Sequence, residues 1–79
     1  MTDTTTQQPL RVSIDGTAGP YIMLPLSQLD EVKRLLDSNG IRHWVEENAI
    51  SLDGAPYIAV VNLGREADAA AVQVLLDGQ

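Results

Sequence analysis

The chain has 79 residues, no cysteine and a formal net charge of −6 at pH 7. This length gives room for a single domain, and the missing thiols exclude disulfides, thiolate nucleophiles and thiolate metal sites. Its five cationic residues are scattered along the sequence, whereas a phosphate backbone or an anionic membrane is bound by clustered cations, so we expect no nucleic-acid partner and no membrane partner.

Residues 1–9 are polar and rich in Thr and Gln, without a periodic apolar pattern. This composition predicts a disordered tail that is not a secretion signal. No segment approaches the roughly 20 apolar residues that cross a bilayer. We therefore expect a cytoplasmic protein with a single α+β domain over residues 10–78.

Two short strands are expected after the tail. The segment 10–14 alternates apolar and polar residues, which predicts a half-buried strand. Its apolar residues, expected to face inward, are Leu10, Val12 and Ile14. The turn dipeptides Asp15-Gly16 and Gly19-Pro20 follow, and a second strand over 21–24 is ended by Pro25. The two strands are candidates for a hairpin.

The clearest element is an amphipathic helix over 27–39, whose apolar residues recur at spacings of three and four. Ser27 and Asp30 have the spacing of a capping box at its start. Gly40 is free to adopt a positive φ just past its end, and Ile41 is expected to fold back onto the helix in a Schellman ending.

The segment 41–46 alternates again and predicts a strand. Arg42, Trp44 and Glu46 are expected on one face and His43 on the other.

The second half of the chain predicts a hairpin followed by a helix. After a kink near Asn48, extended chain over 49–52 and a turn over 53–56 lead to the almost continuously apolar strand 57–63. Asp68 is a favourable N-cap for a helix over 69–77. Gly78 is expected to follow at the C′ position.

The element order is therefore β-β-α-β-(β)-β-α. It predicts an α+β fold, a two-layer ferredoxin-like sandwich with an antiparallel sheet of four or five strands and two helices on one face. The strand that usually follows the second helix is absent, and strand 10–14 is available to take its edge position.

Four stretches carry a resemblance to a known family: the run Leu35-Leu36-Asp37-Ser38-Asn39-Gly40-Ile41, a strand with Val45 and Asn48, the valine-rich strand 57–63, and the alanine-rich segment 67–76. Together they resemble small bacterial signal-transducing domains with a PII-like or ACT-like ferredoxin fold. The resemblance covers about residues 20–77 and consists of core positions. It implies a ferredoxin-like fold and a regulatory role, and it assigns no functional residues.

Trp44 is the only tryptophan, and its expected neighbours on the strand face are Arg42 and Glu46. An exposed Trp between charged residues is typical of a contact hot spot. We therefore expect a partner-binding surface formed by Trp44, Arg42, Glu46 and Tyr57, with Tyr21 also beside it. The alternative, that Trp44 packs in the core beneath a helix, stays open.

No catalytic site is expected. His43 is the only histidine, no Gly-x-Ser-x-Gly elbow accompanies it, and a structural role is the preferred interpretation. A metal site built from His43, Glu46 and Asp53 matches no ligand pattern. The sequence therefore predicts a protein that is not an enzyme and that needs no metal or cofactor.

Three functions remain. The first is a regulatory or adaptor module that binds a protein partner, or a second copy of itself, through an exposed sheet face or edge. The second is a small-ligand sensor of the ACT or PII type, with the ligand at a dimer edge near Gly40, Ile41 and Gly64. The third is a small acidic inhibitor or immunity protein that blocks a basic partner by charge complementarity.

Overall fold

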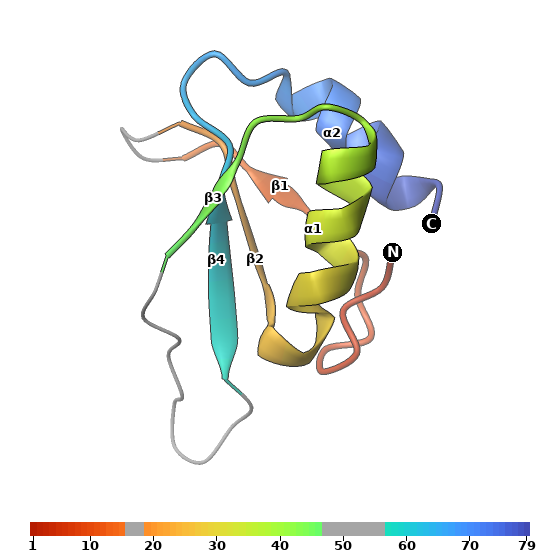
Figure 1. Cartoon of the computed structure of the whole chain (residues 1–79). Helices are drawn as coiled ribbons and strands as arrows, with labels where there is room; N and C mark the ends of the chain where they lie inside the picture. The colour runs from red at the N-terminus through yellow and green to blue at the C-terminus, as the bar shows by residue number, and fades with distance from the viewer. Residues whose placement is uncertain (16–18, 47–56) are drawn as a thin grey trace.

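The computed structural model describes residues 1–15, 19–46 and 57–79. In this part of the chain a four-stranded antiparallel sheet in the order β1-β2-β4-β3 packs against two helices (Figure 1). In chain order the elements are β1 (Val12–Ser13), β2 (Tyr21–Pro25), the 3-10 helix η1 (Leu26–Gln28), α1 (Leu29–Ser38), β3 (Trp44–Val45), β4 (Ile58–Asn62) and α2 (Ala69–Asp77). The predicted α+β class and antiparallel sheet are confirmed. The expected segments 49–52 and 53–56 lie outside the described residues.

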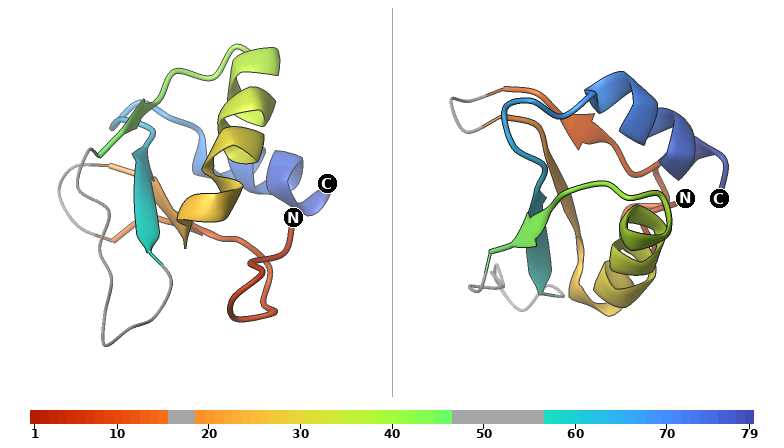
Figure 2. Two further views of the ribbon diagram at one scale, coloured as in Figure 1. Left: turned by 60° about the horizontal axis from the view of Figure 1, so that its bottom comes forward. Right: turned by 45° about the horizontal axis from the view of Figure 1, so that its top comes forward.

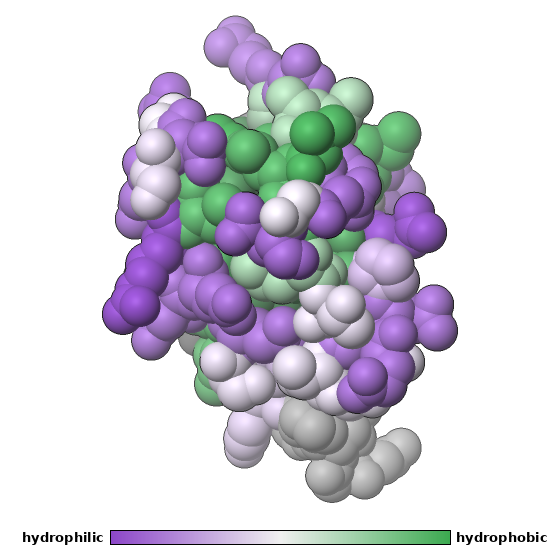
Figure 3. Space-filling model, turned by 90° about the vertical axis from the view of Figure 1, so that its right-hand side faces the viewer, coloured by the Kyte–Doolittle hydropathy of each residue, from purple (hydrophilic) through white to green (hydrophobic). Residues whose placement is uncertain are grey.

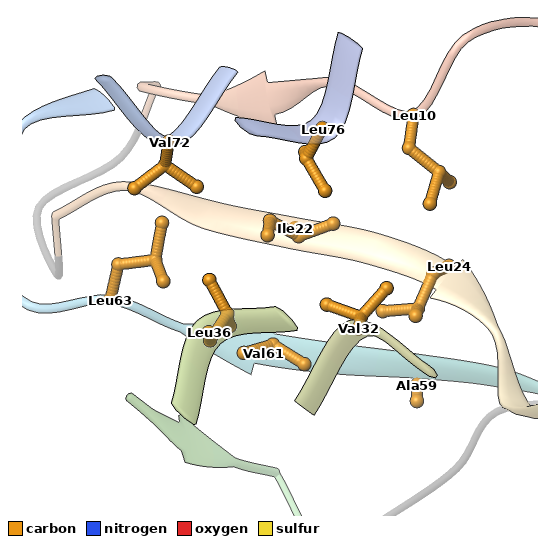
Figure 4. Close-up of a cluster of buried hydrophobic side chains, with 10 residues drawn as sticks. All are labelled: Leu10, Ile22, Leu24, Val32, Leu36, Ala59, Val61, Leu63, Val72 and Leu76. Atoms are coloured by element: carbon orange, nitrogen blue, oxygen red, sulfur yellow. The ribbon is translucent and has the colours of Figure 1, made fainter. Parts of the chain in front are cut away.

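Both helices lie on the same side of the sheet, as the two views of Figure 2 show. Each contributes an i, i+4 pair to the core: Val32 and Leu36 from α1, Val72 and Leu76 from α2. Figure 4 shows these side chains meeting those of β2 and β4 between the layers. The buried apolar residues are Leu10, Ile22, Leu24, Val32, Leu36, Ala59, Val61, Leu63, Val72 and Leu76.

The two edge strands are shorter than the sequence pattern predicted. β1 pairs with β2 only at Val12 and Ser13, and Ile14, which was expected to face inward, is 73% exposed. β3 is restricted to Trp44–Val45 within the predicted 41–46. The hairpin of β1 with β2 is confirmed.

The C-terminal end of α1 has the predicted Schellman geometry. Gly40 has φ +66°, and its N–H donates to the carbonyl of Asp37 at 3.1 Å. The N–H of Ile41 donates to the carbonyl of Leu36 at 2.9 Å. A left-handed residue at C′ satisfies the last carbonyls of the helix in this way.

The predicted capping box at the start of α1 is wrong. Pro25 ends β2 with φ −59°, and the chain then enters the tight turn η1, which contains Ser27. Gln28 therefore occupies the N-cap position of α1, without a side-chain capping hydrogen bond.

The predicted bounds of α2 are correct. Asp68 caps its first turn, accepting a hydrogen bond from the N–H of Ala71 at 3.0 Å. Gly78 is the C-cap residue itself, with φ −79°, and not a left-handed C′ glycine.

A glutamine of α2 covers the outer edge of β1. The side-chain carbonyl of Gln73 accepts from the N–H of Val12 at 2.8 Å, and its amide donates to the carbonyl of Leu10 at 3.0 Å. Gln73 thus occupies backbone groups that a neighbouring strand would otherwise bind, which is one way in which proteins close a sheet edge.

The N-terminal segment forms a loop held by the buried side chain of Gln28. The oxygen of this amide accepts from the N–H of Thr4 at 3.0 Å, and its nitrogen donates to the carbonyl of Thr2 at 2.8 Å. The N-terminal ammonium group also donates to the carbonyl of Leu76. The prediction that residues 1–9 are a disordered tail concerns their motion and stays a prediction.

Candidate binding site

A pocket of about 630 Å³ lies at one end of the sheet, between the chain that enters β3 and the chain that runs from β4 into α2. Ligand pockets in proteins commonly measure ~300–1,000 Å³, so this pocket is of a size that holds a ligand. The apolar side chains that line it are Ile41, Trp44, Leu63, Ala67, Ala71 and Val72.

Strand pairing places Trp44 on the face of the sheet opposite the helices. Trp44 lies across from Asn62 on β4, and Val45 lies across from Val61. Val61 is fully buried in the core. Because successive side chains of a strand point to opposite faces, the side chain of Trp44 is on the helix-free face, where it is 49% exposed.

Two glycines let the chain after β4 approach its neighbours closely. Gly64 has φ +86°, and a Cβ atom placed there would lie 3.5 Å from the Trp44 ring, so the indole packs directly against this backbone. On the other side, a Cβ atom at Gly19 would lie 2.7 Å from the backbone nitrogen of Arg65. The pocket wall at residues 64–65 is thus held between the Trp44 ring and the backbone of Gly19.

A buried polar contact lies next to Trp44 on the helix-free face. Asn62 is 7% exposed, and its side-chain amide donates to Oε1 of Glu46 at 3.1 Å. The N–H of Glu46 donates to the carbonyl of Val60 at 2.9 Å, which continues the β3–β4 pairing past Val45. Tyr21 completes this row of the sheet, because it lies across from Asn62 on β2.

The charged residues that line the pocket are Arg42, Arg65, Glu66 and Asp68. The carboxylate of Asp68 is engaged as the α2 N-cap. Arg42 is exposed, and within the described part of the chain it makes no hydrogen bond or ion pair. The guanidinium of Arg42 is therefore available to a binding partner.

His43 lies away from this surface, with its side chain only 9% exposed. Its Nδ1 donates to the carbonyl of Ile41 at 2.9 Å, and its Nε2 lies 3.7 Å from Oδ1 of Asp37. These contacts join the end of α1 to the chain entering β3, which is a structural role.

The conceivable metal site is not formed by the residues that the structure places. His43 and Glu46 belong to opposite faces of the strand, as their alternating exposure indicates. Asp53 lies outside the described residues. No group of three or more His, Asp or Glu side chains that could hold a metal ion occurs in residues 1–15, 19–46 and 57–79.

The structure brings together residues from two of the predicted sites. Arg42 and Trp44, expected to bind a protein partner, and Ile41 and Gly64, expected to bind a small ligand, line the same pocket. Glu46 and Gly40 are exposed outside the pocket lining.

Tyr57 is placed at the far end of β4 from Trp44. It is 55% exposed and immediately precedes β4, whereas Trp44 pairs with the last residue of that strand. At about 3.3 Å per strand residue, the backbones of Tyr57 and of the residue opposite Trp44 are roughly 16 Å apart. Tyr57 is therefore not a neighbour of Trp44.

Sequence reasoning did not assign the α2 side of the pocket. Leu63, Ala67, Ala71 and Val72 have the spacing and composition of core residues. The sequence indicated this side of the pocket only through Gly64, which was expected near a small ligand. Their part in the site depends on the proximity of β3, which is more than 15 residues away in the sequence.

Figure 3 looks at the side of the molecule that carries the helices and shows hydrophobic surface mainly in its upper half, bordered by hydrophilic residues.

Val74 of α2 is 69% exposed and does not line the pocket. It therefore offers an exposed apolar residue for comparison with Trp44.

No family model matches the chain, and neither a curated protein nor a solved structure matches it. Within the described residues, neither helix has the length and apolar character needed to cross a bilayer.

Proposed function

We propose that this protein is a non-catalytic regulatory or adaptor module that binds a protein partner, or a second copy of itself, through the surface around Trp44. One observation carries the proposal: the only tryptophan is 49% exposed on the helix-free face, at the edge of a 630 Å³ pocket. Large aromatic side chains dominate the energetics of protein interfaces. The proposal makes burial of this indole the main source of affinity.

The surroundings of Trp44 support a protein partner. Arg42 supplies an available guanidinium, and Arg is enriched with Trp and Tyr among interface hot spots. Glu46, two residues after Trp44, is held by the side-chain amide of Asn62. Arg42 and Glu46 therefore give this surface charges of both signs. The net charge of −6 favours a protein, and in particular one with a basic rim, over a nucleic acid.

We further propose that the fold is ferredoxin-like, with β1 in the edge position normally held by a last strand. The strand order β1-β2-β4-β3 and the antiparallel pairing support this assignment. It fits the resemblance to PII-like and ACT-like regulatory domains, and with it a cytoplasmic location. Function still has to be argued from the site, because such folds carry many functions.

The test compares two exposed apolar residues. Trp44→Ala and Val74→Ala each remove an exposed side chain, but only the first touches the pocket. In affinity capture from the native host, read by quantitative mass spectrometry, a genuine partner is retained by the wild type and by Val74→Ala and lost by Trp44→Ala. Equal recovery of all captured proteins by the three forms would contradict the proposal.

A second candidate function is a small-ligand sensor, favoured by the volume of the pocket and its apolar lining. Ala71 lines the pocket and Ala70 does not, although both are exposed on α2. In a thermal-shift screen with a metabolite panel, a sensor's ligand raises Tm for the wild type and for Ala70→Leu. Ala71→Leu, which fills the pocket, abolishes that shift; a shift that survives it counts against this site.

A further inference from the structure

The end of α1 places a chemically labile dipeptide at the protein surface. Asn39 is followed by Gly40, and both residues are exposed to water. Asparagine is a thermolabile residue, because the backbone nitrogen of the next residue can attack its side-chain carbonyl carbon. Glycine favours this attack, since it is the most flexible residue and has no side chain to hinder the approach. The other asparagines of the chain precede Ala49 and Leu63, which leaves Asn39 as the most reactive.

The reaction is a deamidation, and water and its hydroxide ion are the only co-reactants. Hydroxide removes the proton of the Gly40 N–H, and the nitrogen forms a bond to Cγ of Asn39. The bond from Cγ to Nδ2 then breaks, and Nδ2 takes a proton from water and leaves as ammonia, which restores the hydroxide. Water opens the resulting succinimide ring at either carbonyl carbon. The product at position 39 is an aspartate or an isoaspartate, whose main chain runs through Cγ.

The Schellman ending of α1 engages both reacting groups in hydrogen bonds. The N–H of Gly40 donates to the carbonyl of Asp37 at 3.1 Å, and Nδ2 of Asn39 donates to the carbonyl of Leu35 at 2.8 Å. A hydrogen-bonded amide loses its proton only after a local opening, which is the basis of protection from hydrogen exchange. The opening that exposes the Gly40 N–H to exchange is therefore also the opening that permits its attack on Asn39.

Ile41 holds this ending closed. Its N–H donates to the carbonyl of Leu36 at 2.9 Å, and its partly buried side chain packs against the hydrophobic core. An apolar contact just past the helix end commonly accompanies a Schellman motif. Opening of the ending thus requires the side chain of Ile41 to leave the core.

We propose that Asn39 is a deamidation site that the Schellman ending keeps unreactive in the folded protein, and that its modification releases the chain leading into β3. An aspartate at position 39 has no N–H for the carbonyl of Leu35, and its negative charge lies at the negative end of the helix dipole. An isoaspartate adds a methylene group to the main chain, so the next two N–H groups lose their register with the last carbonyls of α1. Ile41 and Arg42 follow directly and line the pocket, so the modification displaces the pocket wall.

The experiment compares the same substitution at two isoleucines. Ile41→Ala removes the contact that holds the ending closed, and we expect the folded variant to deamidate about tenfold faster than the wild type. The exchange rate of the Gly40 amide, measured by NMR, should rise by the same factor. Ile14→Ala, at a residue that is 73% exposed, leaves both rates unchanged. Peptide mapping by mass spectrometry, with enzymatic methylation of isoaspartate, gives the deamidation rate at position 39.

Urea and a core amide distinguish local opening from loss of the fold. In concentrated urea the wild type and both variants deamidate at one rate, and we expect it to exceed that of the folded wild type by roughly a hundredfold, because the reaction then no longer waits for an opening. Exchange of the amide of Val61, which is fully buried in β4, stays slow in folded Ile41→Ala. An acceleration of Val61 equal to that of Gly40 would assign the effect to global unfolding and overturn the proposal.

The second part is tested on the modified protein itself. Wild type that has been deamidated and purified should show shifted amide resonances at Ile41 and Arg42 and altered Trp44 fluorescence. Unchanged resonances at these positions overturn the release of the chain. Equal deamidation in buffer and in urea, or equal rates for Ile41→Ala and Ile14→Ala, overturns the protection. None of these readouts depends on what the surface around Trp44 binds, so a failure of the proposed function leaves the result standing.

Discussion

Among the glycines that the structure describes, Gly19 leaves the least room for a Cβ atom. It has φ +94°, and a Cβ atom would lie 2.7 Å from the nitrogen of Arg65 and from the carbonyl carbon of Gly64. These are backbone atoms that cannot rotate away. We expect Gly19→Ala to lower the free energy of unfolding by about 2–4 kcal/mol, from the positive φ and from displacement of the pocket wall together. Urea unfolding followed by Trp44 fluorescence measures the loss.

Gly40→Ala separates the two causes. Gly40 also has a positive φ, +66°, but no atom beyond its two chain neighbours lies within 4 Å of a Cβ placed there. Only the conformational cost applies, about 1 kcal/mol for a left-handed alanine. If both variants lose the same stability, the close approach of Gly19 to residues 64–65 contributes nothing.

Tyr21 has a phenol whose pKa is raised above its ordinary value of 10.0, chiefly because it donates a hydrogen bond to Asp15 at 2.9 Å. A raised pKa means that folding favours the neutral phenol. The stabilisation is present below pH 10 and is lost as the pH rises through the folded-state pKa.

We therefore expect Asp15→Asn to lower the pKa of Tyr21, since the hydrogen bond is weakened and the negative charge is removed. A Tyr57→Phe background leaves Tyr21 as the only tyrosine, so that phenolate absorbance against pH reports on it alone. An unchanged midpoint after Asp15→Asn would show that this hydrogen bond does not form in solution.

Gln73 joins α2 to β1 through its side chain. Its amide satisfies the N–H of Val12 and the carbonyl of Leu10. Gln73→Ala leaves these partly buried groups without their partner, which costs about 1–3 kcal/mol. Hydrogen exchange read by NMR should show faster exchange of the Val12 amide. The control, Val74→Ala, changes the exposed neighbour on the same helix, and an equal effect of both substitutions would contradict a specific role of Gln73.

The helices were more predictable from the sequence than the strands. α2 begins and ends where Asp68 and the apolar spacing indicate. α1 ends at Ser38, with Gly40 in the predicted C′ position. Both outcomes follow because capping and 3.6-residue periodicity are local properties. The start of α1 was missed because Pro25 leads into a 3-10 turn before the helix begins. β3 is shorter than the strand predicted over 41–46. The length of a strand depends on which residues of the neighbouring strand lie opposite, and the sequence of β3 alone does not contain that information.

The order of the elements along the chain predicted how the helices and the sheet are layered. The pocket could not be predicted from the sequence. Alternation in 41–46 placed Trp44 and Arg42 on one face, and Gly64 was expected near a small ligand. Their meeting with the first turn of α2 arises from the pairing of β3 with β4 and from the packing of both helices on one face. Tyr57 was grouped with Trp44 because a sequence pattern assigns a face but not a position along the neighbouring strand.

The N-terminal loop is held by contacts with residues far away in the sequence, Gln28 and Leu76. Gln28 is 7% exposed because residues 1–9 cover it, and its amide bonds Thr2 and Thr4. Gln28→Ala removes these bonds, so we expect faster hydrogen exchange throughout residues 2–9 and a loss of about 1 kcal/mol in unfolding free energy. Gln8→Ala, in the exposed part of the loop, leaves both unchanged. Unprotected exchange of residues 2–9 already in the wild type would instead establish a disordered tail and leave Gln28 open to water.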